Sequence, residues 1–463
     1  MKNKLLSPMD AMFLYGESRE TMMHVAALMP FTPPPDAPPD FLRQLMDEIK
    51  QTMKVEAPWN KKLRKPKGLR NPLNSWVEDD QFDIEYHVRR SALPSPGDER
   101  ELGILVSRLH SNPLDFTRPP WEIHLIEGLE GGRFAFYIKI HHALVDGYTG
   151  SKILSRSLAT DPDERDTPMF FSRPQPQRKP RDPSTAPALD INSLFQGVMS
   201  DIRDVAKPLS NLIKKPGAEF QSLVSSMQAP HSILNKRISR TRRFATQQYS
   251  LPLLRELAKK SGGTLNDIVL AICAGGLRKF LLELGELPEQ PLIAFLPVNV
   301  RPKDDPGGGN AVGATLVSLA TNVEDPYARL QAIMRSTRKA KKQMENLTQN
   351  TILAYSAFLM APSGLQVVKA MTGIRGRLPL TFNLCISNVP GPDTPRYFRG
   401  ARLEASYPQS IPMHGMALNI TCYSYADTMN FGFIGCRDTL PHLQRLAVYS
   451  GEALRELEEV LGE

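Results

Sequence analysis

Two adjacent histidines followed by an aspartate are the residues best suited to do chemistry. They occur in the run HHALVDG, which holds His141, His142 and Asp146 and ends at Gly147. Imidazole exchanges protons near neutral pH, so a histidine held beside a hydroxyl or thiol can act as a general base. The sequence has no GxSxG elbow and no cysteine in an evidently reactive setting. A covalent nucleophile is therefore not indicated.

A strand is expected to present these groups, because residues 133–140 alternate strictly between two faces. One face carries the apolar side chains Phe134, Phe136, Ile138 and Ile140. The same alternation places His142 with the apolar face and His141 opposite. Gly147 then supplies backbone freedom before a helical run begins.

Two other interpretations of the histidine pair remain open. A metal site is disfavoured, because adjacent strand residues point apart and Asp146 is the one further local ligand. A core role is the other, in which His142 is merely buried and hydrogen-bonded. The general base is favoured over both, since the histidines and the carboxylate cluster at the end of a rigid strand.

The run HHALVDG resembles the HHxxxDG signature of acyl-CoA-dependent acyltransferases, which share a fold with chloramphenicol acetyltransferase and the condensation domains of peptide synthetases. Further blocks resemble, in order, those of the bacterial wax ester synthase/diacylglycerol acyltransferase family. These blocks are LSPMDAMFLYGESRETMMHV (residues 6–25), PLDFTRPPWE (113–122), NDIVLA (266–271), PVNVRP (297–302), GGGNAVG (307–313), SNVPGP (387–392) and HGMALNITCYSY (414–425). The resemblance covers nearly the whole chain.

This resemblance implies an α/β fold of two chloramphenicol-acetyltransferase-like lobes, each a mixed sheet with helices, with an active-site tunnel at their interface. It makes His142 the general base that deprotonates an alcohol attacking an acyl-CoA thioester, with His141 as a supporting neighbour. Asp146 is implied to be structural, holding the loop by an ion pair, and Gly147 permits the turn. Acyl-CoA is a substrate, the acceptor is a long-chain alcohol or diacylglycerol, and no metal or bound cofactor is expected.

Candidates for the oxyanion site or the substrate tunnel come from the second half of the chain. Thr264 and Asp267 have capping-box spacing at the start of a helix, which places Asn266 in its first turn near free N–H groups. Asn266 and Asp267 are therefore oxyanion candidates, and the alternative is that they only cap and brace the helix. Ser387 and Asn388 precede a rigid Pro-Gly-Pro loop, which we expect at the lobe interface.

Three segments are expected along the 463 residues. Residues 1–165 form a lobe carrying HHALVDG, residues 166–245 a Pro-rich and helical linker, and residues 246–463 a lobe carrying NDIVLA and SNVPGP. Helical periodicity is expected over residues 39–53, 99–110 and 251–260. Four cysteines without metal-site spacing suit a reducing compartment.

An excess of 57 Lys and Arg over 49 Asp and Glu gives a net charge of +8, which suits an anionic partner. The basic clusters lack interleaved aromatics and nucleic-acid-binding motifs, so no nucleic acid is expected. No apolar run is long enough to span a bilayer. We expect a cytoplasmic protein, peripherally associated with the inner face of the membrane or with lipid droplets, and residues 61–70 are the leading anchor.

Two functions from other classes are kept as alternatives. One is a condensation-type acyltransferase using carrier-protein thioesters, which donor preference would separate from an acyl-CoA enzyme. The other is a non-catalytic basic protein of lipid surfaces, which has no need of an ordered general base.

Overall fold

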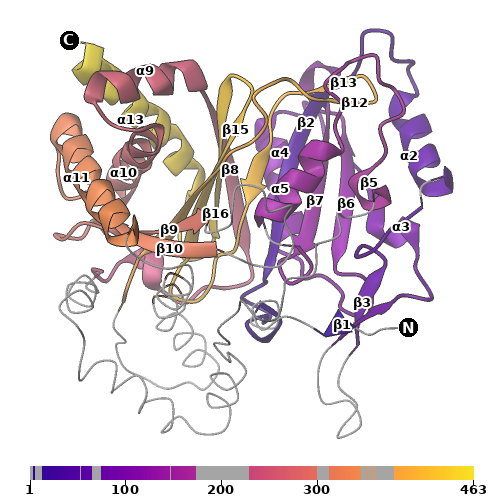
Figure 1. Ribbon diagram of the computed structural model, residues 1–463, viewed down its shortest axis with the longest axis horizontal. Coiled ribbons are helices and arrows are strands. Elements are labelled where there is room, and N and C mark those ends of the chain that lie inside the picture. Colours follow the sequence, from indigo (N-terminus) through magenta and orange to yellow (C-terminus); the bar gives the residue numbers. More distant parts are fainter. Residues whose placement is uncertain are drawn as a thin grey trace, which may run out of the picture.

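The computed structural model describes residues 4–5, 13–52, 54–64, 75–145, 147–173, 229–299, 312–345 and 380–462, and the single positions 352, 356 and 359. Asp146, most of the expected linker and residues 65–70 lie outside these ranges. Two lobes stand side by side, each built on a mixed sheet with helices against it (Figure 1). The expected α/β fold of two lobes is confirmed.

The first lobe is built on a seven-stranded sheet whose central strand carries the histidine motif. Its order is β12 (Tyr397–Phe398), β13 (Ala401–Leu403), β2 (His24–Thr32), β7 (Phe134–His141), β6 (Trp121–Glu127) and β5 (Val88–Ala92), and β14 (Tyr407–Gln409) also pairs with β2. β7 is antiparallel to both of its neighbours, and its His141 pairs with His24 of β2. β7 is buried throughout, as befits a central strand.

Strands β12, β13 and β14 come from the second half of the chain, so that half completes the first sheet. The second sheet has the order β10 (Val312–Ser318), β9 (Ile293–Asn299), β11 (Leu384–Val389), β15 (Leu418–Tyr425), β16 (Thr428–Cys436) and β8 (Arg242–Ser250). A small third sheet joins β1 (Lys4–Leu5), β4 (Ser75–Glu78) and β3 (Lys61–Arg64). The two lobes are therefore joined by shared strands as well as by packing.

Helices cover the sheets as their apolar periodicity requires. The first lobe carries α2 (Phe41–Thr52), α3 (Ile84–His87), α4 (Glu99–His110) and α5 (Gly147–Arg156), and the second carries α9 (Leu251–Ser261), α10 (Leu265–Glu283), α11 (Pro326–Glu345) and α13 (Gln444–Gly462). Short 3₁₀ turns are η2 (Glu130–Gly132), η3 (Phe170–Ser172) and η5 (Ile233–Asn235). The three helices expected from periodicity are confirmed, as α2, α4 and α9.

Helix α4 lies between the lobes, and it and its C-cap residue Ser111 supply polar partners to the edge strand β8. The Ser111 hydroxyl accepts a hydrogen bond from the Arg242 N–H at 2.8 Å, and the Ser107 hydroxyl accepts one from the Phe244 N–H at 3.0 Å. Buried N–H groups at a strand edge need such partners. The serines therefore fix the first lobe against the edge of the second sheet.

Candidate active site

The alternation of β7 separates two environments. Phe134, Phe136, Ile138 and Ile140 belong to one apolar cluster of the first lobe, whereas Ala135 and Tyr137 belong to another that includes α4. The prediction of two distinct faces is confirmed.

His142 follows the last residue of β7 and is held by the N-terminal segment. Its backbone N–H donates to the carbonyl of Met23 at 2.9 Å. Its ring stacks on Phe13, with ring centroids 4.0 Å apart and planes inclined by 25°. The imidazole is half-buried, so it lies on a packed support while keeping contact with the surface.

His141 occupies a different environment and is only 1% exposed. Its Nδ1 accepts a hydrogen bond from the Ala143 N–H at 3.1 Å, which leaves the proton on Nε2. Nε2 lies 3.4 Å from a carboxylate oxygen of Glu17, and Phe116 meets the ring edge-on at 4.9 Å. The two histidines therefore have separate partners.

The rest of HHALVDG leads into α5. Asp146 lies outside the described residues. Gly147 is the first residue of α5, is exposed, and has no atom within 4 Å of where a Cβ would stand. Its φ is not among the positive values, so the expectation that glycine is needed for the turn is not supported by conformation or packing.

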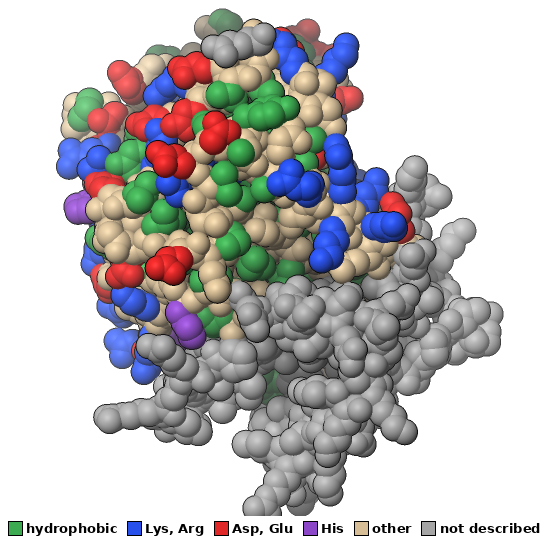
Figure 2. All heavy atoms as spheres, turned by 90° about the vertical axis from the view of Figure 1, so that its left-hand side faces the viewer, with side chains coloured by type: hydrophobic (Ala, Val, Ile, Leu, Met, Phe, Trp, Pro, Cys, Tyr) green, Lys and Arg blue, Asp and Glu red, His purple; other side chains and the backbone are tan. Residues whose placement is uncertain are grey.

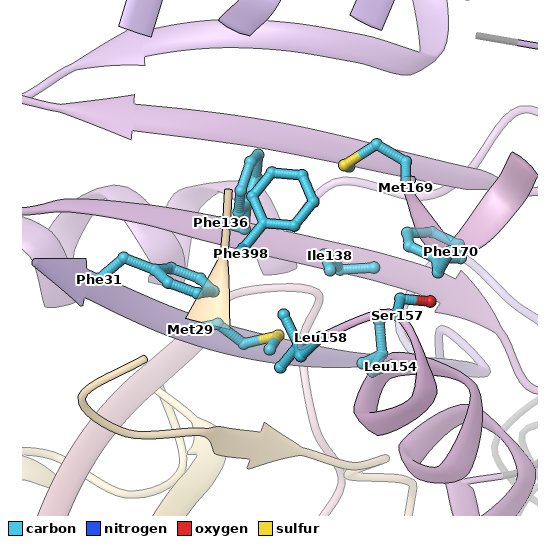
Figure 3. A pocket seen from close by; sticks show the side chains of 10 residues that line it. All are labelled: Met29, Phe31, Phe136, Ile138, Leu154, Ser157, Leu158, Met169, Phe170 and Phe398. Carbon is cyan, nitrogen blue, oxygen red and sulfur yellow. The ribbon is translucent and has the colours of Figure 1, made fainter. Parts of the chain in front are cut away.

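An apolar pocket of about 30 Å³ lies beneath α5, room for about two water molecules. Phe136 and Ile138 of β7 contribute to its wall from the face to which Ile140 also belongs (Figure 3). Met29 lines it from β2, and Leu154 and Leu158 from α5 and the residues after it. The strand that ends at the histidines thus also lines an apolar space.

The opposite face of β7 carries a buried polar network. The Lys139 ammonium lies 2.5 Å from the Glu122 carboxylate and donates to the carbonyls of Leu109 and Asn112 at 2.9 Å each. Burial alone would raise the pKa of Glu122, but the adjacent His124 and Lys139 side chains lower it to about 2. This network braces the strand from the side away from the pocket.

The capping box expected at the start of α10 is confirmed. Asp267 accepts hydrogen bonds from the backbone N–H and the hydroxyl of Thr264 at 2.8 and 2.7 Å, and the Thr264 hydroxyl accepts from the Asp267 N–H. The other Asp267 oxygen accepts from the Thr337 hydroxyl of α11 at 2.6 Å. Asp267 therefore caps and braces α10, while Asn266 is half-buried in its first turn.

Ser387 and Asn388 lie half-buried on the central strand β11, in parallel register with Thr421 and Cys422 of β15. The lobe-interface position expected for the loop that follows stays a prediction, and its Gly391 packs closely against Ser424 and Tyr423 of β15. Val389 packs against the cluster that contains Phe136 and Ile138, as does Tyr423 of β15.

Among the described residues, no group of three His, Cys, Asp or Glu side chains is arranged to hold a metal ion. All four cysteines are buried and free.

Comparison with known proteins identifies the family. Residues 6–269 match the wax ester synthase/diacylglycerol acyltransferase catalytic domain, and residues 308–458 match the C-terminal domain of the same family. The chain belongs to this family. The resemblance read from its motifs is confirmed.

Individual relatives align over almost their whole length. A putative diacylglycerol O-acyltransferase of Mycobacterium tuberculosis is 56% identical, over 98% of this chain and 96% of its own. The O-acyltransferase WSD of Acinetobacter baylyi is 40% identical, over 98% and 97%. The solved wax ester synthase/diacylglycerol acyltransferase of Marinobacter aquaeolei superposes with a TM-score of 0.80 at 38% identity, over 99% of this chain and 100% of its own.

More distant structures share only the fold. The first condensation domain of the calcium-dependent antibiotic synthetase superposes with a TM-score of 0.58 at 15% identity, over 100% of this chain and 97% of its own. The condensation-domain-like architecture expected from HHxxxDG is confirmed.

Sequence reasoning missed the residues that hold the histidines: Phe13, Glu17, Met23 and Phe116. Three of them fall within the first family-like block and Phe116 within the second. The blocks can be seen in the sequence, but the contact that each side chain makes cannot, because Phe13 and Glu17 lie more than a hundred residues before the histidines and Phe116 lies 25 residues before His141.

Proposed function

We propose that this protein is an O-acyltransferase that moves a long-chain acyl group from acyl-CoA to a fatty alcohol, a diacylglycerol, or both, with His142 as the general base. One observation carries the assignment of His142. A half-buried imidazole, supported by Phe13, stands at the end of the strand whose apolar face lines the pocket under α5.

The reaction needs one base and no covalent intermediate on the protein. His142 takes the proton of the acceptor hydroxyl while the hydroxyl oxygen attacks the thioester carbonyl. The tetrahedral intermediate collapses, its C–S bond breaks, and the CoA sulfur leaves and takes the proton back from the imidazolium. An ester and free CoA are the products. A thioester already has a good leaving group, so positioning and a single base are sufficient.

The remaining motif residues take supporting roles in this proposal. His141 holds the strand end, Asp146 keeps the loop in place by an ion pair, and Gly147 begins α5. The oxyanion is stabilised by polar groups such as Asn266, Ser387 or Asn388, of which the two on β11 precede Val389, a residue that packs against the cluster of the first lobe. Asp267 only caps α10 and takes no part in stabilising the oxyanion.

The pocket under α5 supports a long apolar substrate. Its wall is made of aromatic, aliphatic and methionine side chains, and Met29 is flexible enough to yield to an alkyl chain (Figure 3). As it stands the space admits about two water molecules, so we propose that its walls part to receive the end of one of the two alkyl chains. No metal or bound cofactor takes part in the proposed reaction.

The proposed location is the cytoplasmic face of the membrane or a lipid droplet, reached by peripheral attachment. No helix among the described residues combines the length and apolar character needed to cross a bilayer. In the expected anchor, Lys62 is already paired with Asp79 at 2.7 Å and Asp80 at 3.2 Å, which weakens the case for that segment.

A second basic segment is better exposed. Lys and Arg side chains gather along one edge of the outer face of the second lobe (Figure 2). The last turns of α11 expose five cations: Arg335, Arg338, Lys339, Lys341 and Lys342. Each basic residue near an anionic surface contributes about 1 kcal/mol. Co-sedimentation with anionic vesicles across a salt series, using Glu substitutions in either segment, decides which one anchors the protein.

The function is tested with purified protein, labelled palmitoyl-CoA, and hexadecanol and diacylglycerol in competition. Thin-layer separation of the products should show labelled wax ester, triacylglycerol or both, and at least about 100-fold less of either with His142→Ala. Palmitoyl-carrier protein is the matched donor. Absence of labelled ester from palmitoyl-CoA refutes the proposal, and ester from the carrier-protein donor alone supports the condensation-type alternative.

A further inference from the structure

The N-terminal segment closes over the histidine pair and contacts both of its members. Phe13 stacks on the His142 ring at 4.0 Å, and Met23 accepts the His142 backbone N–H at 2.9 Å. Glu17 lies between these two positions in the sequence. One of its carboxylate oxygens accepts a hydrogen bond from the Met23 N–H and lies 3.4 Å from Nε2 of His141. Glu17 is thus linked to both histidines.

His141 has a specific need for such a partner. Its Nδ1 accepts from the Ala143 N–H, so Nε2 carries the proton and must donate it. Nε2 is buried and makes no hydrogen bond with the described residues, and the Glu17 carboxylate lies at ion-pair distance from it, 3.4 Å away. A buried N–H without an acceptor is costly, and the Glu17 carboxylate is the charged group placed to receive it.

The segment is itself anchored to the second lobe, so Glu17 is held on a rigid support. Ser18 and Thr21 close a turn through two hydrogen bonds of 2.9 Å. The buried guanidinium of Arg242, on β8, donates to the carbonyl of Glu20. The segment therefore spans from the second lobe to the strand end that carries the histidines.

We propose that Glu17 is a positioning residue: its carboxylate orients the His141 ring and, through Met23, seats the backbone of His142. This inference rests on the proposed function, because it assigns to Glu17 the task of holding the base. It touches no substrate and transfers no proton. Its removal should therefore lower the rate of acyl transfer more than the binding of acyl-CoA.

Kinetics provide the first test. Glu17→Ala should lower kcat by about 10- to 100-fold while KM for palmitoyl-CoA changes by less than about threefold. Glu17→Gln keeps an oxygen acceptor of the same reach and should lose less than Glu17→Ala. Glu20→Gln is the matched control, because Glu20 meets Arg242 through its backbone carbonyl and its side chain is 39% exposed. It should retain wild-type kinetics.

A double-mutant cycle separates positioning from a general loss of structure. In a His141→Asn background, Glu17→Ala should cost clearly less than it does alone, because part of its effect passes through the imidazole. Fully multiplicative losses, or a Glu17→Ala enzyme with wild-type kcat, overturn the inference.

Nuclear magnetic resonance of the histidine side chains tests the contact between Glu17 and His141 without an activity assay. A slowly exchanging Nε2–H signal should be present in the wild-type protein, disappear in His141→Asn, and exchange faster in Glu17→Gln. A Glu17→Gln protein with an unchanged signal overturns the inference even if the wild type makes no ester. Lack of ester formation by the wild type refutes the proposed function alone.

Discussion

The Lys139 ammonium and the Glu122 carboxylate lie 2.5 Å apart, on directly paired positions of β7 and β6. Lys139 stands two residues before the histidine pair. Their side chains are 0% and 8% exposed, respectively. Removal of one partner from such a pair leaves an uncompensated buried charge. The pair therefore makes the strand that carries the candidate active site sensitive to single substitutions.

Glu122→Gln should lower the free energy of unfolding by about 3 kcal/mol or more, measured by urea denaturation at neutral pH. The control is Glu127→Gln on the same strand, whose pair with Arg90 is 27% and 40% exposed and should cost about 1 kcal/mol or less. Equal losses of unfolding free energy for the two substitutions would show that burial of the Glu122–Lys139 pair does not determine its contribution to stability.

His142→Ala should reduce kcat by about 10²- to 10⁴-fold with little change in melting temperature, because a half-buried ring is lost but the strand remains. His141→Asn should leave measurable activity, since that imidazole supports the base without replacing it. Steady-state rates with palmitoyl-CoA and hexadecanol provide the comparison. A His142→Ala enzyme that keeps its rate would remove the general base from the mechanism.

The pocket under α5 predicts a dependence on chain length. Ser157 lines the pocket, so Ser157→Leu fills space that an alkyl chain would enter. The ratio of rates with palmitoyl-CoA and octanoyl-CoA, or with the matching alcohols, should fall by about tenfold or more, as expected for lost burial of two methylene groups. Ser155→Leu, two residues earlier in the last turn of α5 and outside the pocket lining, is the control. If the ratio of rates is unchanged for both the acyl-CoA and the alcohol series, the alkyl chains do not enter the pocket under α5.

Local signals predicted what lies within one element. The period-two alternation of β7 identified the two faces, and the spacing of Thr264 and Asp267 identified the start of α10. Helix α4 has the limits that its periodicity predicted. These features depend on residues a few positions apart, so the sequence displays them directly.

Contacts that depend on strand register could not be predicted. Glu17 reaches His141 because β2 pairs with β7 and brings His24 opposite His141, and nothing local specifies that pairing. Strands β12 to β14 are only two or three residues long, too short for a periodic signal, yet they extend the first sheet. The division into two lobes predicted from the sequence did not indicate that strands of the second half would join the first sheet.

Gly391 and Gly147 should respond differently to alanine. A Cβ at Gly391 would stand 2.2 Å from the Ser424 carbonyl oxygen and 2.4 Å from the Tyr423 ring, whereas one at Gly147 would meet nothing within 4 Å. Gly391→Ala should therefore lower the free energy of unfolding by about 1 to 3 kcal/mol, as overpacking does. Gly147→Ala, at the start of α5, should leave it unchanged or raise it slightly. Thermal unfolding of both variants measures this, and a stable Gly391→Ala protein would contradict the close approach.

Acid should destabilise the protein through histidines that are buried in the neutral form. Burial lowers the pKa of His87 to about 4, although its Nδ1–H donates to the Trp121 carbonyl at 2.7 Å. Burial also lowers the pKa values of His24 and His110 well below the ordinary value of 6.5. As the pH falls below 6.5, the unfolded chain takes up protons that the folded chain does not, so the free energy of unfolding falls.

Between pH 7.5 and pH 5, His87 alone should remove about 2 kcal/mol from the free energy of unfolding. His87→Phe keeps a ring between Phe82 and Trp121 but cannot take up a proton. It should therefore reduce the difference in unfolding free energy between the two pH values by about that amount. The hydrogen bond that it loses is lost at both pH values. His231→Gln, at an exposed position, should leave the difference unchanged. Urea unfolding of the three proteins at both pH values measures these differences. If His87→Phe shows the wild-type difference, the acid sensitivity does not come from this imidazole.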